Sequence, residues 1–181
     1  IKFIKGEITN DKITFKEDIK NTKTYFGIGF DIHRLVEKKK LYLGGTRIPF
    51  HSGLKGHSDG DVILHAIIDA ILGAIRKKDI GSLFPDNKNK YKNIRSPNML
   101  KPVLEILDKG NFYINNLDIN LICEQPKVSK YREKIISSLS NLLKLNKDLI
   151  NLKGKTVEKL GLIGKEKAIA CEVIVSICKY D

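Results

Sequence analysis

Residues 57–75, HSDGDVILHAIIDAILGAI, constrain the fold more than any other part of this sequence. After a polar start, their apolar side chains recur at helical spacing on nearly every side, and Ser58 with Asp61 forms an S-x-x-D capping signal. The pattern predicts a helix that is almost wholly buried. Such a helix needs other elements to cover it, so the rest of the chain has to supply a packed layer.

Strand signals come before this helix. Residues 25–33, YFGIGFDIH, predict a strand that ends in polar side chains. Residues 41–50, LYLGGTRIPF, predict a hairpin, because Gly44 and Gly45 supply the positive φ angles that a two-residue turn demands.

Strands and helices mix in the second half of the chain. Ser96 followed by Pro97 is a cap residue before a proline at the first helical position, and it predicts a helix that runs to Gly110. Further elements are expected as a strand at 116–123, an amphipathic helix at 129–145, and strands at 149–156 and 167–179, the last one central because it is continuously apolar.

The order β-β-β-α-α-β-α-β-β predicts an α+β fold, an α/β sandwich in which a mixed sheet carries its helices on one face. The length of 181 residues suits one domain, which we place at 25–181. Residues 1–24 alternate charged and apolar side chains without a sustained period, and we expect an N-terminal extension that is flexible or a remnant of a targeting region. No apolar run approaches the ~20 residues that span a bilayer, so no membrane partner is expected.

The net charge of +12 does not by itself predict a nucleic-acid partner. Only 5 of the 33 basic residues are arginine, and the lysines are scattered rather than gathered with aromatic residues in one stripe. We therefore expect no nucleic acid; an anionic small molecule fits the charge at least as well. Cys123, Cys171 and Cys178 lie in apolar runs without disulfide or zinc-ribbon spacing, which indicates buried thiols.

Asp31 and His33 are the first candidates for chemistry. On a strand, residues two apart point to one side, so these two side chains can converge on one ion, with His65 of the helix as a third ligand. One carboxylate and two imidazoles suit zinc, and three protein ligands leave a position open for a substrate. The alternative is a pair of surface polar residues beside a helix histidine.

The polar start of the helix is the second candidate. Free N–H groups at a helix start, with the side chains of His57 and Ser58 beside them, could cradle a phosphate. Asp61, His65 and Asp69 recur every four residues and share one helix face, where a carboxylate could orient a metal-bound histidine. The alternative is a capping pair followed by a solvated acidic stripe.

Two loops are weaker candidates. Residues 79–86, DIGSLFPD, have carboxylates at both ends, which could accept hydrogen bonds from sugar hydroxyls. In 156–161, TVEKLG, Glu158 is an oxygen ligand suited to Mg²⁺ and Thr156 could donate to a phosphoryl oxygen. Each segment by itself could equally be an ordinary turn.

Taken together, the motifs GFDIH, GGTRIPF, GLKGHSDGDVILHAIIDAILGA, DIGSLFPD, QPK and TVEKLG resemble the 2-C-methyl-D-erythritol 2,4-cyclodiphosphate synthases in order and spacing. The resemblance covers about residues 25–179. It implies an enzyme of isoprenoid biosynthesis that converts 4-diphosphocytidyl-2-C-methyl-D-erythritol 2-phosphate into the 2,4-cyclodiphosphate and CMP. It also implies a homotrimer with each site at a subunit junction, one Zn²⁺ per subunit, and Mg²⁺ or Mn²⁺ with the diphosphate.

The resemblance assigns roles to individual residues. It places zinc on Asp31, His33 and His65 and the second ion on Glu158; His57 and Thr156 become the residues that stabilise the transition state. Asp61 and Asp69 become supporting residues. The implied substrate contacts, among them a cytosine-binding loop at 123–129, are Ser58, Asp79, Gly81, Phe84, Pro85, Asp86, Cys123, Glu124, Gln125, Pro126, Lys127, Val128, Ser129, Lys155, Val157, Leu162 and Lys165.

Two positions depart from the family pattern. Leu162 and Lys165 stand where an aromatic residue and an arginine are common, and they cannot supply the stacking or the guanidinium fork. Family precedent favours a plastid-type organelle, the apicoplast or the chloroplast stroma, with bacterial cytoplasm as the alternative. A metal-dependent phosphohydrolase that uses water, and a catalytically silent RNA-binding module, remain alternative functions.

Overall fold

The computed structural model describes residues 23–85, 87–88, 91 and 93–179. Its strands are β1 (Lys23–Glu37), β2 (Leu41–Leu43), β3 (Thr46–Ile48), β4 (Ser52–Leu54), β5 (Phe112–Ile122), β6 (Ile150–Lys155) and β7 (Ala168–Lys179). Its helices are α1 (Val62–Ala74), α2 (Ile80–Leu83), α3 (Ser96–Lys109), α4 (Arg132–Leu143) and α5 (Gly161–Gly164), with 3₁₀ turns η3 (Val128–Lys130) and η4 (Lys147–Leu149).

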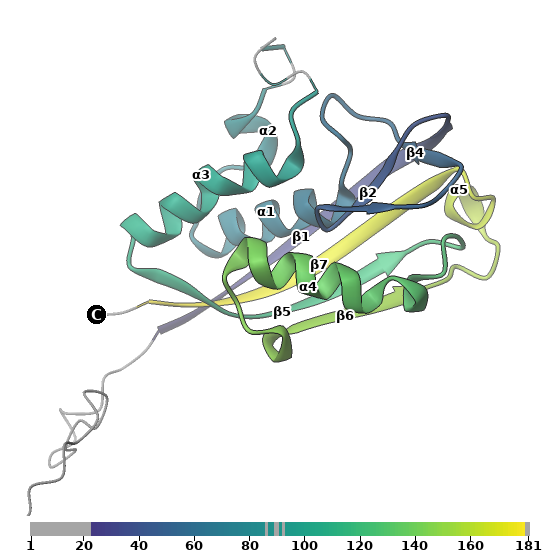
Figure 1. Ribbon diagram of the computed structural model, residues 1–181. Helices are drawn as coiled ribbons and strands as arrows, with labels where there is room; N and C mark the ends of the chain where they lie inside the picture. Colours follow the sequence, from purple (N-terminus) through teal and green to yellow (C-terminus); the bar gives the residue numbers. More distant parts are fainter. Residues whose placement is uncertain (1–22, 86, 89–90, 92, 180–181) are drawn as a thin grey trace, which may run out of the picture.

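One mixed sheet organises these elements, in the order β4-β1-β7-β5-β6. The β5–β6 pair is parallel and the other neighbours are antiparallel. Helices α1, α3 and α4 cover one face of the sheet (Figure 1). The predicted α+β class is confirmed, and so is the central place of the last strand, because β7 pairs with both β1 and β5 along most of its length.

Helix α1 lies directly on β1 because two glycines remove the side chains that would hold it away. A Cβ atom at Gly27 would stand 1.9 Å from the carbonyl oxygen of Ala70, and one at Gly29 would stand 1.9 Å from that of Ala66. The small residues of α1 therefore sit against strand backbone. Eleven of the thirteen residues of α1 are buried, as its sequence predicts.

Two predicted helix starts are wrong in detail. Asp61 rather than Ser58 is the N-cap of α1, since its carboxylate accepts from the backbone N–H groups of Ile63 and Leu64. Ser96 is not a cap either: Arg95 is the N-cap of α3, and the Ser96 side chain bonds to Asp59 instead. The Ser58 oxygen instead accepts from Gly60 N and contacts His65, and the partner of Ser96 lies thirty-seven residues away, which local sequence does not reveal.

Several boundaries also differ. The strand predicted at 25–33 extends from 23 to 37, because its far end pairs with β4, a short strand that was not predicted. The helix predicted from 129 begins at Arg132 after the turn η3. The four-residue helices α2 and α5 were missed, since they are too short for a periodic signal.

The expected extension, 1–24, lies mostly outside the described residues, although residues 23 and 24 belong to β1. No described helix has the length and apolar content needed to cross a membrane.

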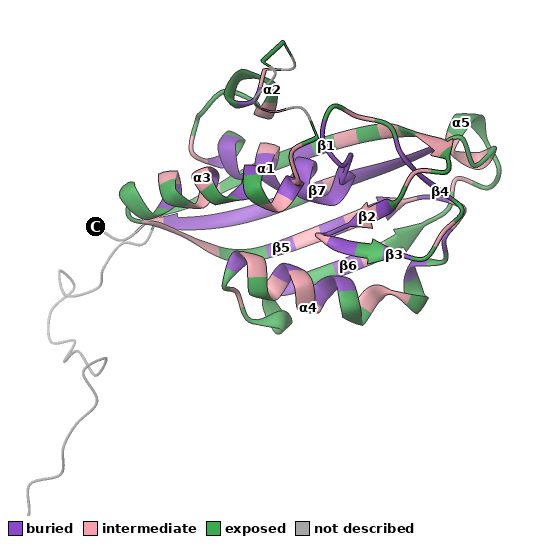
Figure 2. Cartoon of the chain, turned by 45° about the horizontal axis from the view of Figure 1, so that its top comes forward, coloured by how far each residue is buried: buried purple, intermediate pink, exposed green. Residues whose placement is uncertain are grey.

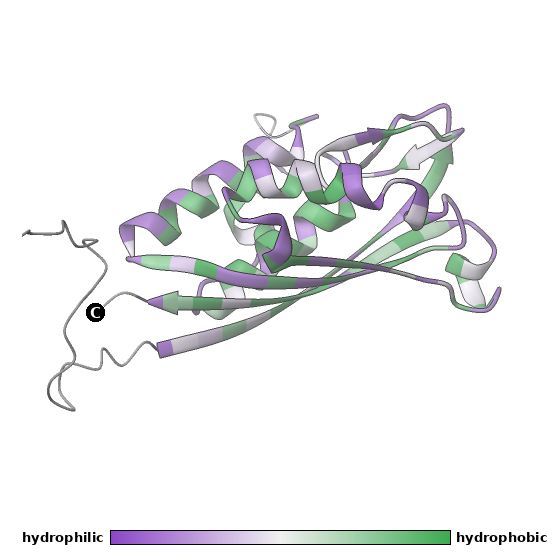
Figure 3. Ribbon diagram, turned by 60° about the horizontal axis from the view of Figure 1, so that its bottom comes forward, coloured by the Kyte–Doolittle hydropathy of each residue, from purple (hydrophilic) through white to green (hydrophobic). Residues whose placement is uncertain are grey.

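The sheet face that carries no helices is unusually apolar. Alternate residues of β1 project from it, namely Phe26, Ile28, Phe30 and Ile32, and Ile174 of β7 lies beside Ile28. Their exposed fractions run from 45% to 70%, although each belongs to a long strand in the middle of the molecule (Figures 2 and 3). An exposed apolar patch of this kind on one chain marks an interaction surface.

The close approach of α1 to β1 makes a prediction about stability. Gly27→Ala puts a Cβ atom into backbone that cannot rotate away, so we expect the free energy of unfolding to fall by about 3 kcal/mol or more in urea titrations. Gly73→Ala is the matched control on α1, because Gly73 is exposed and a Cβ atom there would have the carbonyl oxygen of Ile28, at 3.8 Å, as its nearest neighbour. It should stabilise by about 0.5–1 kcal/mol; equal effects of the two changes would refute the account.

Candidate active site

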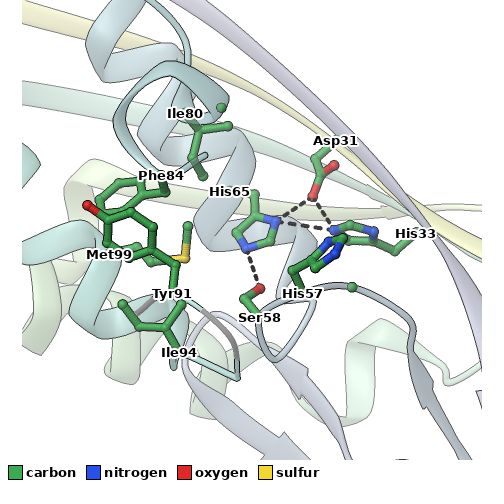
Figure 4. Close-up of a pocket in the computed structure, with 12 residues that line it drawn as sticks. Asp31, His33, His57, Ser58, His65, Ile80, Phe84, Tyr91, Ile94 and Met99 are labelled. Atoms are coloured by element: carbon green, nitrogen blue, oxygen red, sulfur yellow. Dashed lines mark hydrogen bonds and ion pairs between the residues drawn. The ribbon is translucent and has the colours of Figure 1, made fainter. Parts of the chain in front are cut away.

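Three side chains from two elements meet at one point. Asp31 and His33 project from β1, and His65 comes from the first turns of α1 (Figure 4). Asp31 Oδ2 lies 2.9 Å from His65 Nδ1 and 3.1 Å from His33 Nε2, and the two ring nitrogens are 3.2 Å apart. The sequence-predicted trio therefore converges, with one donor atom from each residue facing the other two.

The donor set fits a zinc ion. Ligand atoms bound tetrahedrally at about 2.0–2.1 Å stand roughly 3.3 Å apart, close to the separations of this trio. The mixture of one carboxylate oxygen and two imidazole nitrogens is also a zinc set. A face remains for a further ligand, because the trio lines a cavity of about 230 Å³.

The trio is electrostatically coupled. Burial on its own raises the pKa of Asp31, but hydrogen bonds and charge from His33 and His65 outweigh it and bring that pKa to about 2. Burial on its own lowers the pKa of His65, but the hydrogen bond and charge of the Asp31 carboxylate outweigh burial and leave that pKa raised. Asp31 thus stands ionised across the physiological range, ready to hold a cation.

The cavity has one polar and one apolar side. His57 and Ser58 lie beside the trio, as the sequence predicts, and Gly81 and Phe84 line the cavity as well. The apolar side was not predicted from sequence; it consists of Ile80, Tyr91, Ile94 and Met99 (Figure 4). These residues come from α2, the following loop and α3, and only tertiary packing brings them together.

Asp61 and Asp69 hold neighbouring segments of the site in place. Asp61 is fully buried, and its two oxygens accept from Gly44 N at 2.8 Å and Gly45 N at 2.6 Å as well as from the first turn of α1. It therefore fixes the β2–β3 turn against the helix start. Burial raises its pKa, and these N–H donors act in the opposite direction.

Asp69 positions the next segment of the cavity. Its Oδ1 accepts from Ile80 N at 2.7 Å, which holds α2 against α1, and burial raises its pKa. Asp79 is the N-cap of α2 and accepts from the backbone N–H and hydroxyl of Ser82. Asp79 and Pro85 do not line the cavity, and Asp86 lies outside the described residues.

The predicted cytosine-binding loop forms a second cavity, of about 240 Å³. It is lined by eight predicted residues, Cys123, Glu124, Pro126, Lys127, Val128, Ser129, Lys155 and Thr156, and by two that were missed, Arg132 and Gly154. Gly154 is required there, because a Cβ atom would stand 2.8 Å from Val128 Cβ. Burial raises the pKa of the Cys123 thiol to about 11, so this thiol is a packing group rather than a nucleophile.

Glu124 ties the two loops of the second cavity together. Its Oε1 accepts from Val157 N at 3.1 Å and from Lys159 N at 3.2 Å. Glu158 lies between these two donors in the sequence, and Lys159 is one of them. Both have positive φ angles, 51° and 63°, which cost free energy in residues other than glycine. The sequence did not predict this side-chain clamp, because its two donors lie more than thirty residues away from Glu124.

The other predicted residues of this region do not line the second cavity. Gln125 precedes Pro126, Val157 contributes its N–H to Glu124, and Glu158 Oε1 accepts from the hydroxyl of Thr156 at 2.8 Å. Leu162 is 61% exposed on α5, and Lys165 is its C-cap residue. Among the described residues, none lines both cavities.

The Glu124 clamp makes a prediction about loop 156–159. Glu124→Ala leaves two amide donors without this acceptor, at a cost of about 1–3 kcal/mol, so their hydrogen exchange should accelerate at least about tenfold. Glu124→Gln keeps an acceptor oxygen and serves as the control, with a much smaller effect. Unchanged exchange at Val157 and Lys159 in the alanine variant would show that the clamp does not hold the loop.

Known proteins match both the sequence and the fold. The model of the YgbB family matches residues 24–178. A bifunctional enzyme IspD/IspF from Pelagibacter ubique is 56% identical over 182 residues, which are all of this chain and 49% of that protein. The 2-C-methyl-D-erythritol 2,4-cyclodiphosphate synthase of Caldicellulosiruptor bescii is 48% identical over 153 residues, 84% of this chain and 98% of that one.

Solved structures agree. A Plasmodium falciparum IspF structure described as a CDP complex has a TM-score of 0.77 at 40% identity, and the match covers 87% of this chain and 97% of that one. The bifunctional IspDF of Campylobacter jejuni has a TM-score of 0.85 at 37% identity, over 99% of this chain and 50% of that one. The chain thus spans about half the length of its bifunctional relatives. The resemblance read from the motifs is confirmed, and the chain belongs to the YgbB family.

Proposed function

We propose that this chain converts 4-diphosphocytidyl-2-C-methyl-D-erythritol 2-phosphate into 2-C-methyl-D-erythritol 2,4-cyclodiphosphate and CMP. A 2-phosphate oxygen attacks the β-phosphorus, the bond from that phosphorus to the bridging oxygen breaks, and CMP leaves with the bridging oxygen. The observation that carries this proposal is the convergence of Asp31, His33 and His65 at the wall of a cavity. The 48% identity over 153 residues, which cover 98% of a synthase, supports it.

Such a transfer needs two anions held in line and their charge neutralised, rather than a protein nucleophile. Zn²⁺ on Asp31, His33 and His65 would supply a Lewis acid for a phosphoryl oxygen, and Mg²⁺ or Mn²⁺ on Glu158 would neutralise charge between the phosphates. A single carboxylate suits the second ion, because Mg²⁺ commonly shares its ligands with substrate phosphates.

The protein groups bind and orient the substrate. Ser58 would donate to the methylerythritol phosphate portion of the substrate, and His57 and Thr156 would hydrogen-bond the moving phosphoryl oxygens. The apolar side of the first cavity suits the methyl-bearing carbon chain of the substrate and excludes water that would otherwise compete as a nucleophile. The second cavity, with Lys127 and Lys155, would take the cytidine end.

We further propose that residues 25–181 act as one domain that assembles as a homotrimer. The two cavities share no lining residue, which suits an assembly in which one substrate contacts the first cavity of one copy and the second cavity of a neighbour. The exposed apolar face of β1 supports such an assembly, because association would remove Phe26, Ile28, Phe30 and Ile32 from water.

The compartment also belongs to this proposal. The expected plastid-type organelle has no support beyond family precedent. The two curated relatives described above are bacterial, which favours the alternative, bacterial cytoplasm.

Phosphorus NMR of the incubated substrate tests the reaction. We expect resonances of a cyclic diphosphate and of CMP, which disappear when a chelator removes divalent ions. Free phosphate would instead support a water-using phosphohydrolase. An unchanged substrate, combined with salt-sensitive RNA binding and no zinc after purification, would support the RNA-binding alternative.

His65→Ala is the matching variant. It removes one of three zinc ligands, so the folded protein should lose its zinc and essentially all turnover. His51→Ala is the control, since His51 is an exposed histidine that stacks on Phe50 away from the trio. Metal analysis that finds equal zinc in both variants would exclude the trio as the binding site.

Glu158→Ala tests the second ion. Loss of the only carboxylate assigned to that ion should raise the Mg²⁺ concentration for half-maximal rate by about tenfold or more. Glu105→Ala removes an exposed carboxylate on α3 and should leave the titration unchanged. An identical Mg²⁺ titration for Glu158→Ala and wild type would contradict the role of Glu158.

A further inference from the structure

His65 has a second ring nitrogen that faces away from the trio into the protein. Its Nε2 lies 3.0 Å from Ser58 Oγ and 3.1 Å from Ser96 Oγ. Ser96 is fully buried at the first turn of α3, thirty-one residues from His65 in the sequence. No sequence motif singled out this serine for chemistry.

The direction of the Ser96 hydroxyl is fixed by Asp59. Ser96 Oγ donates to Asp59 Oδ1 in a short hydrogen bond, and Ser96 N donates to the same oxygen. The single hydroxyl hydrogen is therefore spent on Asp59, and the Ser96 oxygen can only accept from His65. Nε2 of His65 then carries a hydrogen, which leaves Nδ1 as the nitrogen that binds a metal ion once the ion replaces its hydrogen bond to Asp31.

Asp59 itself is held rigidly. Its other oxygen accepts from Arg95 Nε at 2.7 Å, and the Arg95 guanidinium lies 3.7 Å from the ring centroid of Tyr42 in the β2–β3 hairpin. The Asp59 side chain is 6% exposed. Donors from Arg95 and from the backbone of Ser96 converge on this carboxylate, and the Ser96 hydroxyl points its hydrogen at the same acceptor.

We propose that Ser96, oriented by Asp59 and Arg95, is a positioning residue that holds His65 in the tautomer whose Nδ1 can ligate the metal. The inference rests on the proposed function, because it deepens the role of the same metal trio. Ser58 cannot replace Ser96 in this role: its oxygen already accepts from Gly60 N, which leaves its own hydrogen able to point at His65 Nε2. Only the Ser96 hydroxyl has its direction set by a buried carboxylate.

Zinc affinity of the metal-stripped chain tests the proposal without any turnover. In competition with a chromophoric chelator, Ser96→Ala should bind zinc about 10- to 100-fold more weakly than wild type, the usual effect of losing a partner of a metal-bound histidine. Nitrogen NMR of histidine-labelled, zinc-loaded protein should show a slowly exchanging hydrogen on Nε2 of His65 in wild type and a faster-exchanging one in Ser96→Ala. Ser96→Thr restores the hydroxyl and should recover most of both signals.

Ser140→Ala is the matched control, because it removes a hydroxyl on α4, away from the trio, that donates to the backbone oxygen of Leu145. Ser96→Ala should still fold, since Asp59 keeps its hydrogen bonds from Arg95 and from the backbone N–H of residue 96. Urea unfolding verifies this. Unchanged zinc affinity and unchanged exchange of the Nε2 hydrogen in Ser96→Ala, or an equal loss in Ser140→Ala, overturns the inference. Failure of wild type to bind zinc would instead overturn the metal site and the proposed function.

Discussion

The contact between α1 and β1 is the constraint on which the rest of the site depends. Gly27 and Gly29 let the helix backbone settle onto the strand, and the same register that exposes Phe30 and Ile32 leaves Asp31 and His33 within reach of the helix. A larger residue at either glycine would move His65 away from its partners. The close contact between α1 and β1 therefore determines both the packing of the helix and the positions of the three site residues.

Three carboxylates turn this contact into a defined site. Asp61 joins the helix start to the β2–β3 turn, Asp69 joins the helix to α2, and Asp59 joins the loop before α1 to the start of α3. Each accepts from N–H or O–H donors of a different segment, so removal of any one leaves donors without their acceptor. These acids therefore hold segments together, whereas the three candidate metal ligands are the two strand residues and His65.

The sequence was informative where signals are periodic or local. The buried helix, the hairpin at Gly44 and Gly45 and the central last strand were predicted because each has its own pattern over several residues. The metal trio was predicted because strand and helix periodicities place ligand types on facing sides. The partners of Ser96 and Glu124 were not predictable, since each bonds to a segment more than thirty residues away.

The separation of the two cavities has a genetic consequence. If each working centre takes its zinc trio from one copy and its cytidine loop from a neighbour, damage to the two groups falls on different copies at any given junction. Chains defective only in the trio and chains defective only in the loop would then restore one another when they co-assemble, because some junctions combine the sound half of each. Two inactive alleles of this gene would complement within one oligomer.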